Sequence, residues 1–172
     1  MLTRAVQAQT GSAIYGTAVP SAALRARFTA VIGGGTGADG MAFVMLDPAH
    51  ATPQALGHTG GGLGYAGLSG VAITLDTFRN VNNPSSNFVG VATGAAGGAL
   101  TYAATATAIG NLRTGSHVID VTVAAGHIRV SVDGKPVIDT AVSLPGSVLV
   151  GFTGATGGRN DIHTVRAAAI SY

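Results

Sequence analysis

The sequence predicts an all-β fold, an antiparallel β-sandwich built as a single domain that spans residues 1–172. Three observations favour this prediction. Short apolar runs alternate with polar residues, as half-buried strands do. Clusters of Gly, Pro, Asn or Asp separate these runs. No convincing long helix is visible, and many short strands without one are typical of two packed antiparallel sheets.

The expected strands follow one another with turn residues between them. They cover residues 27–32, 41–46, 71–77, 87–91, 117–123 and 147–153. Two more, 127–132 and 136–142, flank Asp133-Gly134, a pair that favours a tight β-hairpin. Residues 95–108 give a weak signal, interpreted as a strand at 100–105 with flexible flanks. Residues 47–62 are predicted to form a long loop with room for a helical turn, suited to the wall of a binding site.

The composition limits the class of protein. Hydrophobic residues make up 47% of the chain, 27 residues are Gly, and only 9% are charged. This mixture is too apolar for a disordered chain and too rich in Gly for a helical one. No window approaches the roughly 20 apolar residues of a membrane helix, and no secretory h-region is visible, so we expect no membrane insertion. The absence of Cys excludes disulfides, Cys–zinc sites and thiol catalysis.

The charged residues exclude further functions. The net charge is +2, and the Arg residues are scattered without a basic stripe or interleaved aromatics, so nucleic-acid binding is not expected. All seven acidic residues are Asp. Glycoside hydrolysis needs two carboxyl groups that flank one bond, and no predicted strand carries two inward carboxylates at a suitable spacing. No Ser stands in a nucleophile elbow. The sequence therefore predicts that the chain is not an enzyme.

Residues 71–84, VAITLDTFRNVNNP, combine a strand with a loop rich in oxygen ligands. Short oxygen-bearing side chains occur within eight residues: Asp76, Asn80, Asn82 and Asn83. Hard cations such as Ca²⁺ take about six to eight oxygen ligands from carboxylates, amides and backbone carbonyls. The loop can supply several of these. The alternative is ordinary turn chemistry, in which Asn is common.

Three further stretches accompany this loop: ADGMAFV at 38–44, GGGLGY at 60–65 and VGFTGATGG at 150–158, the last followed by Asp161 and His163. With LDTFRN at 75–80 between them, their order and content resemble the L-type lectin family, which comprises the legume lectins, the cargo lectins of the secretory pathway and their bacterial relatives. The resemblance covers nearly the whole chain. It implies a legume-lectin or concanavalin-like jelly roll and carbohydrate binding, in a member of bacterial or phage type.

The resemblance also implies which residues bind the sugar. Asp39 follows a cis peptide bond in this comparison and accepts hydrogen bonds from sugar hydroxyls. Asn80 donates its NH₂ group to the sugar, and the ring of Phe78 covers the sugar's apolar face. Backbone amides and one unusual Arg complete the set, which is Asp39, Gly61, Phe78, Asn80, Gly157, Gly158 and Arg159. Arg159 adds a fixed array of donors that suits an acidic sugar; alternatively, it pairs with Asp161 or points into solvent.

A Ca²⁺ site is the second implication of the resemblance. Its ligands are Asp76, the Phe78 carbonyl, Asn80 and Asn83. Asn83 stands where the family has Asp, and the loss of that charge weakens a calcium site. Thr74 and Phe88 stand where the legume lectins have the Glu and His of a transition-metal site, so no transition metal is expected.

Two functions therefore remain open. The first is a calcium-dependent carbohydrate-binding module, whose partners are glycans or a cell-surface polysaccharide. The second is a structural or adhesion protein, such as a virion decoration or tail component, that keeps a lectin-like sandwich with a degenerate site. Either function predicts a location outside the cell or on a particle surface. Sheet edges in this family often pair across subunits, so a homo-oligomer or a larger assembly is also open.

Overall fold

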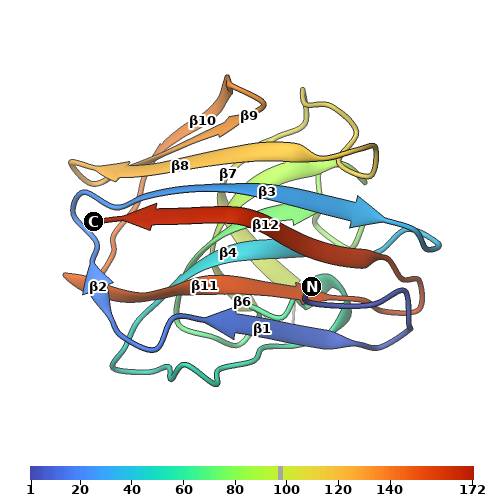
Figure 1. The fold of residues 1–172 in the computed structure, drawn as a ribbon, viewed down its shortest axis with the longest axis horizontal. Helices are drawn as coiled ribbons and strands as arrows, with labels where there is room; N and C mark the ends of the chain where they lie inside the picture. Colours follow the sequence, from blue (N-terminus) through green and yellow to red (C-terminus); the bar gives the residue numbers. More distant parts are fainter. Residues whose placement is uncertain (97–98) are drawn as a thin grey trace.

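Two antiparallel β-sheets pack face to face in the computed structural model, which describes residues 1–96 and 99–172 (Figure 1). One sheet has the strand order β1-β11-β4-β5-β6-β7, with β2 paired to β11, and the other has the order β10-β9-β8-β3-β12. The predicted antiparallel β-sandwich is therefore confirmed. The strands are β1 (Thr10–Ile14), β2 (Val19–Pro20), β3 (Arg25–Gly33), β4 (Gly40–Leu46), β5 (Gly70–Asp76), β6 (Phe88–Ala96), β7 (Ala99–Ala106), β8 (His117–Ala124), β9 (His127–Val132), β10 (Lys135–Ala141), β11 (Ser147–Ala155) and β12 (Ile162–Ser171).

The hydrophobic core lies between the two sheets. Alternation along β8 sends Ile119, Val121 and Val123 inward and leaves the residues between them partly exposed. An aromatic cluster joins the sheets, because Phe28 of β3 lies 4.9 Å from Phe152 of β11 between ring centroids and 6.0 Å from Phe43 of β4. Burial of these apolar side chains is the main force that holds the layers together.

The sequence missed three strands, β1, β2 and β12. β12 is an edge strand that pairs with β3, apart from an isolated bridge between His163 and Thr3. Its register shifts between Arg166 and Ala169, with Ala167 at a φ of 48°. This bulge and the exposed alanines interrupt the alternation that identifies a half-buried strand. β1 is also an edge strand, and none of its five residues is fully buried. Pairing with a neighbour, rather than local pattern, defines both strands.

The turns and loops of the structure agree with the sequence-based predictions better than strands β1 and β12 do. Asp133 and Gly134 both have positive φ, 52° and 77°, as a type I′ turn requires, and they join β9 to β10. The predicted strand at 100–105 is confirmed as β7; its predicted flexible flank includes residues 97–98, which lie outside the described residues. The long loop after β4 contains one 3₁₀ turn, η1 (Gly60–Gly62). Within the described residues, no helix is long and apolar enough to cross a membrane.

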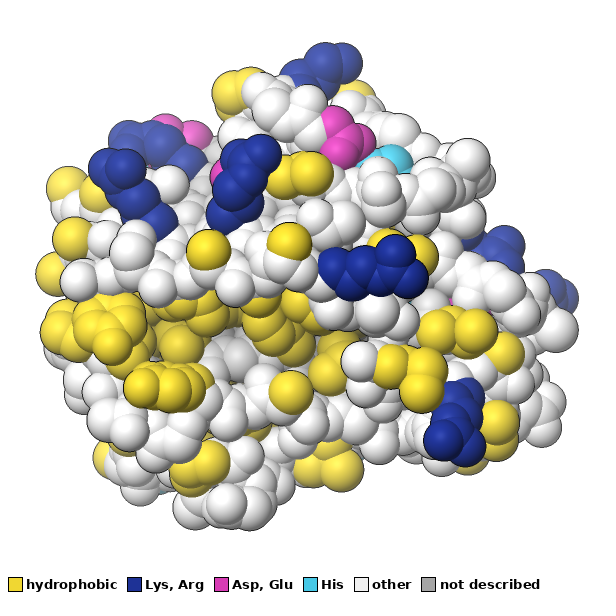
Figure 2. All heavy atoms as spheres, viewed as in Figure 1, with side chains coloured by type: hydrophobic (Ala, Val, Ile, Leu, Met, Phe, Trp, Pro, Cys, Tyr) yellow, Lys and Arg dark blue, Asp and Glu magenta, His cyan; other side chains and the backbone are white. Residues whose placement is uncertain are grey.

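The two sheets do not close on each other along the side seen in Figure 2. Hydrophobic side chains line a hollow between the layer that contains β3 and β12 and the layer that contains β11 and β1. β12 and β1 are the edge strands of the two sheets on this side, and in the described chain no further strand pairs with either of them there, apart from the isolated bridge of Thr3 with His163. Lys and Arg side chains are scattered over this face and form no continuous stripe (Figure 2).

Candidate functional site

Strand register brings the predicted site residues to one edge of the larger sheet. Gly40, the first residue of β4, pairs with Asp76, the last residue of β5, and on its other side with Ala155, the last residue of β11. The segments that follow Asp76 and Ala155 therefore begin beside Asp39. Antiparallel pairing thus joins stretches that are far apart in the sequence.

The backbone of Asp39 is held from both sides. Its N–H donates to the Ala155 carbonyl at 3.1 Å, and its carbonyl accepts from the Thr77 N–H at 2.8 Å and the Thr77 hydroxyl at 3.2 Å. The Ala38–Asp39 peptide bond is cis, as the resemblance implied. Asp39 is 3% exposed, so its side chain is fixed at the base of the site.

The carboxylate of Asp39 has one satisfied and one unsatisfied oxygen. Oδ1 accepts a hydrogen bond from Asn80 Nδ2 at 3.3 Å, whereas the buried Oδ2 has no partner among the described residues. Burial raises the pKa of Asp39 above its ordinary value, and the Asn80 hydrogen bond opposes that rise. A buried polar oxygen without a donor is uncommon in native proteins. Oδ2 is therefore an acceptor whose hydrogen-bonding capacity is unused in the structure.

Glycines allow the backbone to approach Asp39 and Asn80 closely. A Cβ atom on Gly61 would lie 2.5 Å from Asn80 Nδ2, and one on Gly157 would lie 2.9 Å from Asp39 Oδ2. The loop that carries Gly61 is tied to the loop of Gly157, because Gly60 N–H and the Thr59 hydroxyl both donate to the Thr156 carbonyl, at 3.1 and 2.7 Å. The two loops thus form one wall around Asp39.

The 157–159 loop differs in detail from its prediction. Gly157 N–H donates to the Arg159 carbonyl at 3.0 Å, so a ligand would have to displace that bond to use this amide. A Cβ on Gly158 would meet no atom within 4 Å, so this residue borders open space. Arg159 Nη1 donates to the Thr36 carbonyl at 3.4 Å. The predicted pairing of Arg159 with Asp161 is wrong, because Asp161 pairs with Arg113 instead.

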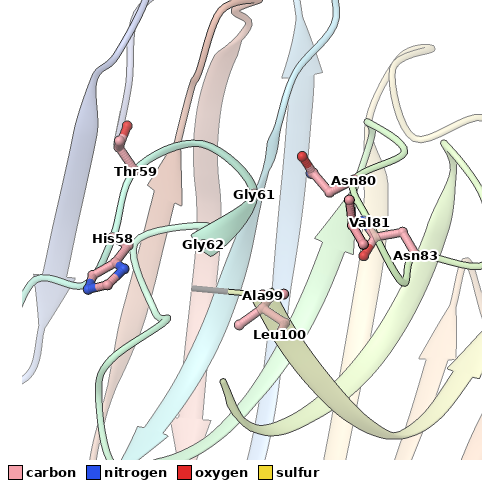
Figure 3. Close-up of a pocket in the computed structure, with 9 residues that line it drawn as sticks. All are labelled: His58, Thr59, Gly61, Gly62, Asn80, Val81, Asn83, Ala99 and Leu100. Atoms are coloured by element: carbon pink, nitrogen blue, oxygen red, sulfur yellow. The ribbon is translucent and has the colours of Figure 1, made fainter. Parts of the chain in front are cut away.

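A pocket of about 750 Å³ opens beside Gly61 and Asn80 (Figure 3). It includes Asn83, and three of its lining residues, His58, Thr59 and Gly62, come from the 47–62 loop that the sequence predicted as a binding-site wall. The sequence did not predict the other three, Val81, Ala99 and Leu100. Val81 of the Asn-rich loop is 81% exposed, whereas Leu100 of β7 is 4% exposed. Phe78 is half-buried and does not line this pocket. The pocket therefore combines amide groups with an apolar wall.

Two of the four predicted metal ligands, Asp76 and the Phe78 carbonyl, meet at the side chain of a third, Asn83. Asp76 is fully buried, and its Oδ1 accepts from the Phe78 N–H at 3.1 Å. Asn83 Nδ2 donates to Asp76 Oδ2 at 3.0 Å and to the Phe78 carbonyl at 3.1 Å. Burial raises the pKa of Asp76 to about 8, against the opposing effect of the Phe78 and Asn83 hydrogen bonds and with a further rise from the charge of Asp39.

These residues fit a calcium ion poorly. Asp76 is the one carboxylate among the four predicted ligands, and no group of three or more His, Cys, Asp or Glu suited to a metal occurs in the part of the chain that the structure describes. Phe88 is fully buried and packs edge to face on Tyr102, with ring centroids 5.4 Å apart, and the Thr74 hydroxyl donates to the Gly90 carbonyl at 3.4 Å. At Phe88 and Thr74, apolar packing and a backbone hydrogen bond stand where the resemblance places metal ligands.

A buried polar cluster lies next to the 157–159 loop. Asp161 is fully buried and receives Arg113 Nε at 2.7 Å, Arg113 Nη2 at 3.1 Å and the Gly35 N–H at 3.0 Å. The Thr3 hydroxyl donates to the Asp161 carbonyl at 3.1 Å and lies 2.6 Å from His163 Nδ1. Because that hydroxyl gives its proton to the carbonyl, His163 Nδ1 carries a proton and donates to Thr3. His163 thus links the N-terminal segment to the loop.

We expect His163 to make stability depend on pH. Burial lowers the pKa of His163 from 6.5 to about 4, so the folded chain favours the neutral ring. The resulting stability is complete above pH 6.5 and is lost as pH falls through 4, a total of roughly 3 kcal/mol at about 1.4 kcal/mol for each pKa unit. Chemical unfolding between pH 7 and 4 checks this. Asp39 and Asp76, whose pKa values are raised, titrate in the parent and in His163→Phe alike, so the prediction concerns the difference between the two proteins. The stability of the parent relative to His163→Phe should fall by roughly 3 kcal/mol between pH 7 and 4. A difference that does not change with pH would exclude His163 as the cause.

Comparisons with solved structures identify the architecture. The exoplasmic domain of VIP36, in a form with Ca²⁺ and mannose bound, superposes with a TM-score of 0.77 at 20% identity, over 99% of this chain and 76% of that one. The Lotus tetragonolobus seed lectin gives 0.80 at 17% identity, over 98% and 84%. The chain has the fold of the legume-type lectins. The Bauhinia forficata lectin in complex with GalNAc also matches, with 0.79 at 21% identity over 96% and 80%.

The sequence comparisons give no closer assignment. A scan against protein-family models and a search of curated proteins found no match. At the identities of the three structures above, the likeness shows the fold, which confirms the predicted jelly roll. The function of this chain therefore depends on its own site residues.

Proposed function

We propose that this chain is a carbohydrate-binding module with a lectin-like site at Asp39 and Asn80. The observation that carries the proposal is the buried, unpartnered Oδ2 of Asp39, set against Asn80 and next to the glycine loops. A carboxylate oxygen in that state accepts strong hydrogen bonds from hydroxyl groups. A sugar offers such groups in a fixed geometry.

The pocket beside Asn80 suits the mixed surface of a sugar ring. A sugar has hydroxyls on its rim and C–H groups on its faces. Asn80 provides a polar contact in the pocket, and Asp39, which does not line the pocket, lies next to it through its hydrogen bond with Asn80. The apolar side chains of Val81 and Leu100 receive the C–H groups. Gly61 leaves room for the Asn80 amide, which completes the polar side. Phe78, Gly157 and Gly158 stay in the proposed site as contacts that a bound ligand would create.

The structural neighbours support this choice among functions. They include lectins described as complexes with mannose and with GalNAc. Calcium is left out of the proposal, although VIP36 is described as Ca²⁺-bound, because Asn83 already engages the oxygens of Asp76 and Phe78 that an ion would need. A location outside the cell or on a particle surface, and an origin of bacterial or phage type, stay predictions.

A glycan array tests the proposal directly. The folded parent chain, labelled and applied to neutral and acidic glycans, should give saturable binding to a defined set of them. The second candidate is a structural or adhesion protein with a degenerate site, which the replacements at Thr74, Asn83 and Phe88 favour. That candidate predicts no glycan binding by a chain whose thermal unfolding shows it to be folded. Such a result would exclude the lectin proposal.

Arg159 is expected to favour acidic sugars. Its side chain lies on the exposed surface of the 157–159 loop and is held only by the long bond to Thr36. A guanidinium group can rotate to hold a carboxylate or sulfate through two parallel hydrogen bonds. Arg159→Leu should weaken binding of uronic-acid or sialylated glycans about tenfold and leave mannose and glucose ligands unchanged. Equal effects on both classes, measured on the same array, would remove Arg159 from the site.

A further inference from the structure

We propose that Asn83 organises the binding loop without a metal ion, so that neither the loop nor its ligand binding requires calcium. The metal-free loop is an inference from the contacts of Asn83 alone. Its consequence for glycans rests on the proposed function.

The carboxylate of Asp76 and the carbonyl of Phe78 have hydrogen-bond donors without a cation. The NH₂ group of Asn83 has two protons, and its two acceptors are Asp76 Oδ2 and the Phe78 carbonyl. The other oxygen of Asp76 accepts the Phe78 N–H, and the Phe78 carbonyl also accepts the Asn80 N–H at 3.1 Å. Each of these three oxygens therefore has a proton donor. Buried oxygens that faced an ion would instead lack donors when the ion is absent.

A calcium ion would have to displace the Asn83 amide. Asn83 Nδ2 lies within 3.1 Å of both the Asp76 carboxylate and the Phe78 carbonyl, so it stands where an ion shared by these oxygens would lie. Asn83 could become a ligand only by a half-turn that presents its oxygen and breaks both hydrogen bonds. The ion would gain a ligand set with one negative charge, and ligand charge is a main determinant of calcium affinity.

The backbone of the same residue holds the sugar-binding side of the loop. Asn83 is 8% exposed, and its backbone N–H donates to the Asn80 carbonyl at 3.1 Å. Asn80 in turn reaches Asp39 with its NH₂ group. The chain of contacts from Asp76 through Asn83 and Asn80 to Asp39 fixes the loop by hydrogen bonds alone.

Thermal unfolding of the parent and of Asn83→Asp, each in EDTA and in excess calcium, tests the inference. The Tm of the parent should differ by less than about 1 °C between EDTA and calcium, because the Asn83 amide already occupies the oxygens that an ion would use. Asn83→Asp removes the bridging NH₂ group and places a second carboxylate beside Asp76. It should unfold at a lower temperature in EDTA and gain about 5 °C from calcium, through binding to the folded state.

A calcium-dependent rise in the parent, or stoichiometric calcium binding to the parent in titration calorimetry, would overturn the inference. The absence of a calcium effect in both proteins would also overturn it, because Asn83 would then not be the group that replaces the ion. If Asn83→Asp does not fold in EDTA, it should recover the folded state when calcium is added, which is the same stabilisation by calcium. Asn83→Ser, which has neither the amide nor the charge, is the control: it should lose stability without responding to calcium.

The glycan part is measured separately. Array signals of the parent should be equal in calcium and in EDTA, and their loss in EDTA would contradict the inference. A parent that binds no glycan in either buffer would defeat the proposed function, while the Tm comparison would still decide whether the loop is metal-free. The two failures are therefore distinguishable.

Discussion

Replacement of Asp39 by alanine is expected to abolish glycan binding, with a loss of affinity of at least about 100-fold. The variant removes the unpartnered acceptor Oδ2 and the anchor of the Asn80 amide together. Hydrogen bonds to a charged group contribute about 1.5–3 kcal/mol each, and about 2.7 kcal/mol corresponds to 100-fold. Titration of the parent and the variant with a glycan identified on the array measures the loss.

Two controls separate this effect from a loss of fold. Asp47→Ala removes a half-buried Asp whose side chain contacts Ala49 and His50, outside the site, and this variant should bind as the parent does. Thermal unfolding of Asp39→Ala should remain cooperative, because the neighbouring strands hold the backbone of residue 39. A folded Asp39→Ala variant with parental affinity would show that the ligand lies elsewhere.

Gly61→Ala is expected to weaken glycan binding about 10- to 100-fold. The new Cβ would lie 2.5 Å from Asn80 Nδ2 and 2.6 Å from Asn80 Cγ, well inside contact distance. Asn80 must therefore move, and its hydrogen bond to Asp39 is lost together with the donor for the sugar. Small misplacements of binding groups carry large costs in rigid sites.

Gly16→Ala provides the matched control for Gly61→Ala. The same atom is added at a glycine where nothing lies within 4 Å, far from the site. Binding equal to the parent is expected for Gly16→Ala. Equal binding by Gly61→Ala as well would mean that the position of Asn80 does not matter to the ligand.

The sequence predicted the residues that strand ends bring together. Asp39 precedes β4 and Asp76 ends β5, so once the two strands are paired as antiparallel neighbours, their ends must meet. The Asn-rich loop follows directly from Asp76, which places Asn80 and Asn83 at the same edge. The alternation in β5 and the Gly-rich turns around β4 are patterns within short stretches of sequence, so these elements could be predicted from the sequence.

Other parts of the site depend on contacts between distant segments, which carry no local signal. Arg113 lies 48 residues from Asp161, yet it provides the ion pair that keeps Asp161 from Arg159. The pocket wall at Leu100 belongs to β7, in a stretch whose Ala, Gly and Thr residues match no motif. Sequence spacing alone could not place either residue.

The role of Asn83 shows a third limit. The sequence identifies an oxygen-bearing side chain at a position where the L-type lectins have a carboxylate. An amide also carries two proton donors, and only the geometry shows that these donors face Asp76 and Phe78. The resemblance implied that Asn83 presents its oxygen to a metal ion, whereas in the structure its NH₂ group faces Asp76 and the Phe78 carbonyl.

A crystal structure of the chain with its glycan, grown in the presence of calcium, would locate both the sugar and any ion. It should show a sugar hydroxyl within hydrogen-bond distance of Asp39 Oδ2, a second contact to Asn80 Nδ2, and the Asn83 amide still between Asp76 and the Phe78 carbonyl. A sugar bound away from Asp39, or a calcium ion ligated by Asp76 and Phe78, would contradict this expectation.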